Sequence, residues 1–238
     1  MNNTRFYPTL NGDCHLGHLL LALINYNKAK ELGGTFIVRS EFRLSYLPNG
    51  VTMGQVEGWY NSYINAFKFV GIEAEFMALL HDCSWVEGKL KEHESLHGND
   101  TANNFYPQTN GSQFFHPYSP TWCLERVLLD NRYAVGHVIR GIDLMSEFSL
   151  YTHFCKQLNL PTPVHQYVRH ISIKEGNETK LISKTNKNAV VSDLIAKGIS
   201  SHQLIDFLTV NCLKVSKDGF KLPNVKENII LDVSKLNA

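Results

Sequence analysis

Two histidines, His15 and His18, stand three residues apart at the start of an expected helix, with Gly17 between them. The free backbone N–H groups and the positive dipole end of a helix start attract anions, and two imidazoles add hydrogen-bond donors. Gly12 and Gly17 have no side chain, so a nucleotide can lie close to the backbone there. We therefore predict an anion site at residues 12–18. The alternative is a chance occurrence of a short motif, in which a histidine only caps the helix.

A second basic element, Ser183-Lys184, lies in the last third of the chain, between a turn at 175–177 and a helix expected from about residue 190. A lysine on a loop that closes over a triphosphate would stabilise the charge that develops as pyrophosphate departs. Together with the two histidines, this element favours a nucleoside triphosphate as the anion. Taken alone, it could equally be an ordinary solvated lysine.

A strand, a loop and a helix must position the histidines. We expect a short strand at 5–7, a helix from residue 15 or 16 to 32 that stops at Gly33-Gly34, and a buried strand at 35–39. In this order they form a βαβ unit with a parallel pair of strands. The loop before the helix is then the natural ligand site.

The rest of the chain continues the alternation of strands and helices. Further elements are expected as a helix over 56–70, regular structure at 122–129, a strand at 135–140, a helix from 143 to about 158, a strand at 166–173, and short helices at 192–196 and 201–212. The segment between residues 74 and 119 is rich in His, Asn, Gly and Ser and lacks clear periodicity.

This order of elements predicts an α/β fold: a Rossmann-like, doubly wound parallel sheet that is split by an α/irregular insertion. Ligands in such sheets bind at the carboxyl ends of the strands. We expect four parts: the first half of the sheet domain at 1–73, the insertion at 74–119, the second half with the Ser183-Lys184 loop at 120–212, and a C-terminal tail at 213–238.

Composition limits the classes of protein. The length of 238 residues suits one α/β domain with an insertion, and the lack of a long apolar run excludes membrane insertion. The 23 basic and 22 acidic residues leave a net charge of +1, so any contact with RNA must be local. Five scattered cysteines and a polar amino terminus favour a reducing, cytoplasmic location without disulfides.

These stretches together resemble class I aminoacyl-tRNA synthetases of the glutamyl/glutaminyl group, which includes the short glutamyl-queuosine tRNA(Asp) synthetases. Residues 4–12 and His15-Leu16-Gly17-His18 resemble the opening of that group and its HIGH motif. Residues 36–41 and 136–144 are similar to two later strands, and Ser183-Lys184-Thr185 to the end of the KMSKS motif. The resemblance covers about residues 4–212 apart from the insertion.

The resemblance implies a role for each matching position. His15, His18 and Lys184 would be catalytic, because they would bind the phosphates of ATP and stabilise the transition state of adenylate formation. A Mg²⁺ ion held mainly by the phosphates would be the other cofactor. The remaining implied roles are binding of ATP by Gly17, Asp143 and Ser183, with Asp143 on the ribose, and binding of the amino acid by Arg5, Glu41, Trp122 and Arg140.

Taken singly, these residues also permit simpler interpretations. Arg39 and Glu41 could form a surface ion pair, and Arg140 could be a structural residue at a strand end. A zinc site is also chemically possible at the spacings of His81, Cys83, His93 and His97, although imidazoles in a polar insertion are commonly solvated, and we assign no metal ligands.

Several substitutions depart from the family pattern, among them Leu129, which replaces the first of two usual aspartates while Asp130 is kept. Trp122 stands where the family has a tyrosine, so the amino-acid pocket lacks that hydroxyl. Phe42-Arg43-Leu44 replaces an acidic stretch that lies near the acceptor end of tRNA in the family, and Leu181 replaces the first lysine of KMSKS. Retention of both Arg5 and Arg140 still permits an acidic substrate.

We expect this ligase to adenylate glutamate or a close relative and to transfer it to a nucleic-acid acceptor, a tRNA or a modified base. Only 26 residues follow Cys212, so we expect no anticodon-binding domain in this chain. Two alternatives stay open: a paralogue that activates an amino acid for a non-RNA acceptor, and a non-catalytic binding module derived from a synthetase. The sequence predicts no oligomeric state.

Overall fold

The computed structural model describes residues 1–40, 50–79, 84–86, 88–89, 91–92, 120–169, 171–182, 188–212, 214–216, 219–221 and 229–236. The first half of the fold consists of β1 (Asn3–Phe6), α1 (Leu16–Leu32), β2 (Phe36–Val38), α2 (Met53–Phe69) and β3 (Glu75–Phe76). The second half consists of α5 (Pro120–Arg132), β4 (Val135–Gly141), the 3₁₀ helix η2 (Ile142–Glu147), α6 (Phe148–Gln157) and β5 (Val164–Val168).

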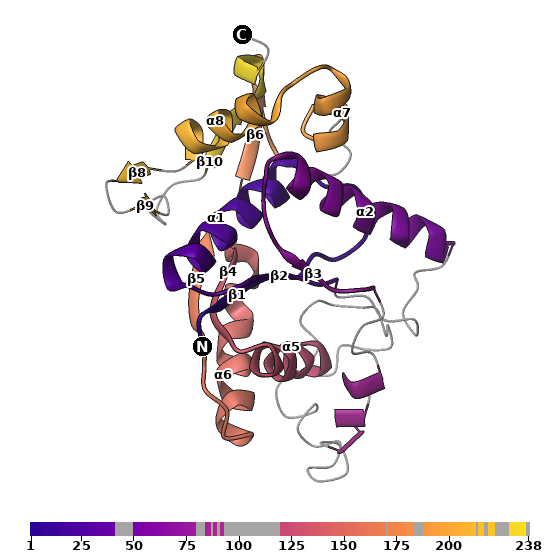
Figure 1. The fold of residues 1–238 in the computed structure, drawn as a ribbon, viewed down its shortest axis with the longest axis vertical. Coiled ribbons are helices and arrows are strands. Elements are labelled where there is room, and N and C mark those ends of the chain that lie inside the picture. The colour runs from indigo at the N-terminus through magenta and orange to yellow at the C-terminus, as the bar shows by residue number, and fades with distance from the viewer. Residues whose placement is uncertain are drawn as a thin grey trace.

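The main sheet has five strands in the order β3-β2-β1-β4-β5, and every neighbouring pair is parallel. Helices α1 and α2 cover one face and α5 and α6 the other (Figure 1). The end of β1 and the residue after it contribute to both layers. Phe6 of β1 belongs to the core with α1 and α2, and Tyr7, which follows β1, belongs to the core with α5 and α6. The predicted doubly wound α/β fold is confirmed.

Helix α1 is the central helix of the first layer. His15 and His18 form a capping box at its start, and Gly33 ends it with a left-handed φ of 63°. On α1, the backbone carbonyl oxygen of the buried Asn25 accepts a hydrogen bond from Thr4 Oγ1 at 2.7 Å. Its side-chain amide donates to the carbonyl oxygen of Ile139 at 2.9 Å, so α1 is tied to both β1 and β4.

The remaining described elements are β6 (Ile171–Glu175), β7 (Glu178–Leu181), α7 (Val191–Ala196), α8 (Ser201–Cys212), β8 (Lys214–Ser216), β9 (Gly219–Lys221), β10 (Ile229–Asp232) and the 3₁₀ helix η3 (Val233–Leu236). Strands β10, β6 and β7 form a second sheet, in which β10 and β6 are parallel. Figure 1 shows this sheet with α7 and α8 beyond the α1 layer.

Several boundaries differ from those expected. The single strand predicted over 166–173 is wrong, because β5 pairs with β4 in the main sheet whereas β6 pairs with β7 and β10 in the other. The main sheet also continues past residue 73, since β3 pairs with β2. The segment expected as a tail, 213–238, includes β10, which buries Ile229 and Leu231 in the α1-side core.

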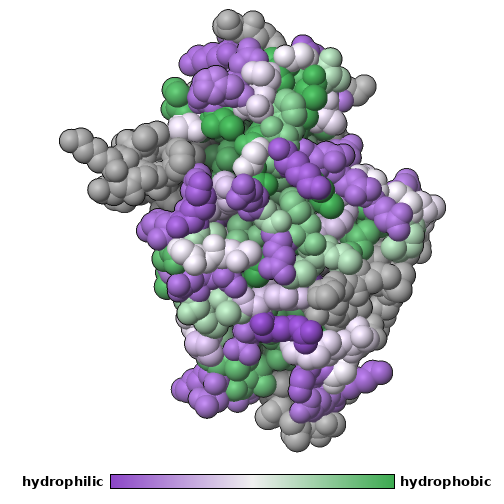
Figure 2. Space-filling view, in the orientation of Figure 1, coloured by the Kyte–Doolittle hydropathy of each residue, from purple (hydrophilic) through white to green (hydrophobic). Residues whose placement is uncertain are grey.

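Figure 2 shows hydrophilic residues spread over the face in view, with hydrophobic residues between them, rather than one continuous patch of either kind. Among the helices of the described residues, none has the length and hydropathy that a bilayer crossing requires.

Candidate active site

A pocket of about 340 Å³ opens at the carboxyl ends of β1 and β4, beside the start of α1. Four predicted site residues line it: Arg5, His18, Arg140 and Asp143. The carboxyl edge of a doubly wound sheet is where such folds bind ligands, because the loops that follow the strands converge there. The structure thus brings together side chains that lie far apart in the sequence.

His15 and His18 lie at the start of α1 with their rings stacked, 3.5 Å apart between centroids and 19° apart between planes. In each ring Nδ1 accepts a backbone N–H, that of His18 for His15 at 3.4 Å and that of His15 for His18 at 3.3 Å. Tyr63 Oη lies 3.2 Å from Nδ1 of His18. Because Nδ1 is an acceptor, the proton of each neutral ring sits on Nε2, where it can be donated to an anion.

Burial keeps both rings neutral. It lowers the pKa of His15 from 6.5 to about 4. Burial, reinforced by repulsion from His15, also places the pKa of His18 well below 6.5. Two adjacent cations in a buried position would be costly, whereas two neutral donors at the positive end of a helix dipole can receive an anion without that cost.

Gly17 is packed against Ile182, the last described residue before 183–187: a Cβ built on Gly17 would lie 3.1 Å from Ile182 Cγ2. On the other side of that segment, the N–H of Leu16 donates to the carbonyl oxygen of Ala189 at 2.8 Å. Ile182 before residues 183–187 and Ala189 after them therefore both contact the start of α1.

Glu41, Ser183 and Lys184 lie outside the described residues, so their roles stay predictions. The same holds for the zinc interpretation of His81, Cys83, His93 and His97. Within the described part of the chain, no group of three or more His, Cys, Asp or Glu side chains could hold a metal ion.

Arg5 is held by a buried carboxylate beneath the pocket. Its Nε and Nη2 donate to the two carboxylate oxygens of Asp130 at 3.1 and 3.3 Å, and Tyr151 Oη also donates to Asp130 at 2.9 Å. The guanidinium lies 4.5 Å from the ring centroid of Tyr7. This two-bond fork fixes the orientation of the guanidinium at the pocket wall.

Arg140, at the end of β4, is held by η2. Its Nη1 donates to Glu147 Oε2 at 2.9 Å and its Nη2 to the carbonyl oxygen of Leu144 at 3.0 Å. Arg140 is thus a structural residue at a strand end, which was its simpler interpretation from the sequence. It is also part of the pocket wall.

Asp143, in the first turn of η2, depends on the glycine before it. A Cβ built on Gly141 would lie 2.2 Å from Oδ1 of Asp143. Gly141 therefore leaves the room that the Asp143 carboxylate occupies at the pocket.

The chain is similar to aminoacyl-tRNA synthetases in sequence. Residues 2–42 match a family model described as the catalytic domain of class I tRNA synthetases for E and Q. A glutamate–tRNA ligase from Chlorobium phaeobacteroides (strain BS1) is 41% identical over 69 residues, 29% of this chain and 12% of the ligase. One from Desulfitobacterium hafniense (strain Y51) is 28% identical over 130 residues, 50% of this chain and 26% of the ligase. The matches thus span about a quarter or less of these relatives.

Solved structures extend the similarity to nearly the whole chain. A glutamate tRNA ligase from Elizabethkingia meningosepticum, in complex with its amino acid, has a TM-score of 0.70 at 14% identity, covering 98% of this chain and 68% of that one. A tyrosyl-tRNA synthetase from Aeropyrum pernix has a TM-score of 0.62 at 12% identity, covering 98% and 75%. The fold is similar to that of these two synthetases. The relatives in sequence and in fold are ligases.

One wall of the pocket at the carboxyl ends of β1 and β4 was not predicted from the sequence. Arg126 of α5 lines the pocket and donates through Nη1 to the same Glu147 Oε2 as Arg140, at 2.5 Å. Its guanidinium also lies 5.9 Å from the ring centroid of Trp122. Trp122 itself is not among the described residues that line the pocket. The spacing from Trp122 to Arg126, four residues on one helix, is the signal that could have identified it.

Arg39 also differs from its simplest interpretation. A surface ion pair is wrong for this residue, because its side chain is only 2% exposed and its Nη1 lies 3.5 Å from Glu125 Oε1. It also donates to the carbonyl oxygen of Ser40 at 3.2 Å. Arg39, which follows β2, therefore links the end of this strand to α5.

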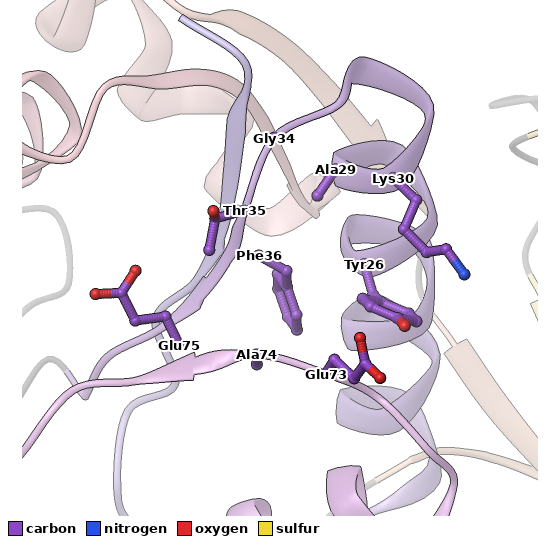
Figure 3. A pocket seen from close by; sticks show the side chains of 9 residues that line it. All are labelled: Tyr26, Ala29, Lys30, Gly34, Thr35, Phe36, Glu73, Ala74 and Glu75. Atoms are coloured by element: carbon purple, nitrogen blue, oxygen red, sulfur yellow. The ribbon is translucent and has the colours of Figure 1, made fainter.

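A second pocket, of about 380 Å³, lies at the other end of the sheet, where β2 and β3 begin. Figure 3 shows its walls: Tyr26 and Lys30 from the end of α1, Phe36 from β2, and Glu73 and Glu75 around the start of β3. Both carboxylates and the ammonium are exposed, so this pocket has none of the buried charge of the first one. It lies away from the predicted site residues.

Proposed function

We propose that the chain activates glutamate or a close acidic relative with ATP and transfers the aminoacyl group to a nucleic-acid acceptor, such as a tRNA or a modified base. One observation carries the proposal: a single pocket at the carboxyl ends of β1 and β4 is lined by Arg5, His18, Arg140 and Asp143. We propose a nucleic-acid acceptor because the relatives in sequence are glutamate–tRNA ligases.

The ATP phosphates would lie at the start of α1. The Nε2–H groups of His15 and His18 and the backbone N–H groups of the first turn would donate to phosphate oxygens. Lys184 would approach from the segment whose described flanks contact the same turn. Asp143 would accept hydrogen bonds from the ribose hydroxyls, as acidic side chains do for vicinal diols.

Mg²⁺ fits this pocket as an ion held mainly by phosphate oxygens, because Asp143 is the one carboxylate among the described residues that line it. The ion would neutralise the phosphate charge that builds up during the reaction. Among the described residues of the pocket, Asp143 is the one that would offer it a carboxylate contact.

The amino acid would lie beside the arginines, with its carboxylates on Arg5 and Arg140 and its α-ammonium on Glu41. An oxygen of its α-carboxylate attacks the α-phosphorus of ATP, and the bond from that phosphorus to the pyrophosphate oxygen breaks. No protein nucleophile is required, so the side chains act by positioning the reactants and by stabilising the developing charge.

ATP–pyrophosphate exchange tests the proposal. Exchange is expected with glutamate and Mg-ATP, and is measured with and without tRNA so that an activation step that requires RNA is not missed. Charging of the tRNA with labelled glutamate then tests the acceptor. If no proteinogenic amino acid supports exchange under either condition, the proposal fails. Exchange without transfer to any RNA would instead support the paralogue with a non-RNA acceptor.

His18→Ala removes one phosphate donor and should reduce the exchange rate by about 100-fold or more, the loss typical of a single preorganised donor to a transition state. His202→Ala is the matched control, since His202 lies on α8 with a side chain 86% exposed. The expected result is an unchanged rate for the control. Equal rates in folded His18→Ala and wild-type protein would contradict the role of His18.

A further inference from the structure

Helix α2 carries a tyrosine that reaches the start of α1. The side chain of Tyr63 is fully buried, and its Oη lies 3.2 Å from Nδ1 of His18. The ring centroids of these two residues are 5.0 Å apart. The residue before Tyr63 also contacts this turn, because the N–H of Cys14 donates to Ser62 Oγ at 3.0 Å. Two neighbouring residues of α2 therefore hold the residues at the start of α1.

The geometry shows which group donates in the contact between Tyr63 and His18. The backbone N–H of His15 lies 3.3 Å from the same Nδ1 and can only donate, so Nδ1 of His18 is an acceptor. The hydroxyl of Tyr63 must then donate its proton to Nδ1. Burial raises the pKa of Tyr63 above its ordinary value of 10, so the hydroxyl keeps this proton at neutral pH.

The ring contacts of His18 do not by themselves fix its orientation. His15 stacks on the ring with centroids 3.5 Å apart, and Phe6 packs against it edge-on with centroids 6.2 Å apart. A half turn of the ring about its Cβ–Cγ bond would preserve both of these contacts. It would, however, place a carbon atom opposite Tyr63 Oη, and a buried hydroxyl that loses its partner is costly. The Tyr63 hydroxyl therefore favours the orientation in which Nδ1 faces α2.

This orientation matters at the pocket at the carboxyl ends of β1 and β4. His18 lines that pocket, whereas Tyr63 is not among the described residues that do so. The hydroxyl of Tyr63 thus acts on a bound ligand through the His18 ring. When Nδ1 is occupied by two donors, the proton of the neutral ring lies on Nε2, the atom that remains for a ligand.

We propose that Tyr63 is a positioning residue of the phosphate site: its buried hydroxyl holds His18 so that Nε2–H is presented to ATP. This inference rests on the proposed function and adds a residue outside the pocket to the same site. A donor that is already oriented before the reaction needs no reorganisation as charge develops on the phosphates, so its benefit is expressed in the transition state.

A double-mutant cycle of Tyr63→Phe and His18→Ala tests the proposal in ATP–pyrophosphate exchange. Tyr63→Phe removes one hydroxyl and should lower kcat by about 3- to 10-fold, the effect expected for one hydrogen bond. The KM for glutamate should stay within about twofold, because the amino acid does not contact His18. In the His18→Ala background, Tyr63→Phe should have no further effect, since the group that it positions is absent.

Tyr60→Phe is the matched control. Tyr60 lies one turn earlier on α2, is also buried, and its hydroxyl donates to the backbone carbonyl oxygen of Met77 instead of to a histidine. Its removal deletes an equivalent hydroxyl from the same helix, so kcat should equal that of wild type. Thermal unfolding shows whether each variant is folded.

Nitrogen NMR of wild-type protein labelled at its histidine rings gives a second test that does not depend on a variant of Tyr63. The His18 signals are assigned by their loss in His18→Ala. At neutral pH they should show the proton on Nε2, and the hydroxyl proton of Tyr63 should show a nuclear Overhauser effect to the His18 ring. A proton on Nδ1 of His18 would overturn the proposal.

Three kinetic results would also overturn it: an unchanged kcat in folded Tyr63→Phe, an equal loss in Tyr60→Phe, or a loss that persists in the His18→Ala background. The last two would show that α2 contributes only through its packing. Failure of the proposed function is distinct, since wild type itself would then show no exchange with any amino acid, whatever the position of the proton on His18.

Discussion

The stacked His15 and His18 respond to acid because they are neutral when folded. The pKa of His15 is lowered to about 4 by burial, and burial with repulsion from His15 lowers that of His18. Between the unfolded value of 6.5 and the folded value, the unfolded chain binds more protons than the folded one. The contribution of these two histidines to the free energy of unfolding is therefore fully present above about pH 6.5 and decreases as the pH falls toward 4.

His15→Asn tests this pH dependence. Asparagine keeps a side-chain acceptor at the N-cap but does not titrate, so the variant should lose less stability than wild type between pH 7 and pH 5. Urea unfolding at several pH values measures the difference. The stability of the variant should still depend on pH to some extent, since burial also lowers the pKa of His165 to about 4. If the free energy of unfolding changes with pH by the same amount in both proteins, His15 is not the neutral, buried group described above.

At the residue scale, the sequence predicts the part of the site that is built from local motifs. Arg5, His18, Arg140 and Asp143 each lie at a strand end or a helix start, where the short motif that contains them also fixes their place in the fold. Arg126 was not predicted, because its contact with Glu147, 21 residues away, depends on the packing of the fold, and only its spacing from Trp122 is visible in the sequence.

At the element scale, helix α1 shows what local sequence can determine. It was predicted from residue 15 or 16 to 32 and spans Leu16–Leu32, because a capping residue precedes it and Gly33 follows it in the left-handed region. The boundary between β5 and β6 could not be predicted in the same way. Strand-forming residues occur on both sides of it, such as Tyr167 and Val168 before and Ile171 and Ile173 after, and the pairing partners change from β4 to β10 and β7.

A pair of glycine variants tests how tightly β1 is packed at its start. A Cβ on Gly34 would lie 2.1 Å from the backbone oxygen of Asn2, so Gly34→Ala should destabilise the protein by about 1–3 kcal/mol, as expected for overpacking. Gly58 lies within α2 with nothing within 4 Å, so Gly58→Ala should be neutral or stabilise by about 0.5–1 kcal/mol. Denaturant unfolding measures both. A neutral Gly34→Ala would show that the contact with β1 is not close.

At the scale of the whole molecule, composition and the order of elements predict the fold class but not the second sheet. The alternation of strands and helices indicates a doubly wound sheet, which five parallel strands confirm. The β10-β6-β7 sheet joins residues 171–181 with residues 229–232, and no local pattern reveals a pairing over that separation. The same sheet leads through Ile182 toward the start of α1.

The net charge of the whole molecule is close to zero. A balance of 23 basic and 22 acidic residues provides little general attraction for a polyanion, so the arginines of the pocket must act locally. Their burial is consistent with recognition of a small acidic molecule, for which desolvated charges give strong selectivity.

The most direct test of the central claim is a crystal structure with a non-hydrolysable sulfamoyl analogue of glutamyl-adenylate. We expect the ribose at Asp143, the sulfamoyl group at the start of α1 beside His15 and His18, and the side-chain carboxylate at the arginines Arg5 and Arg140. Binding of the analogue outside the pocket at the carboxyl ends of β1 and β4, or with its side-chain carboxylate away from both arginines, would contradict the claim.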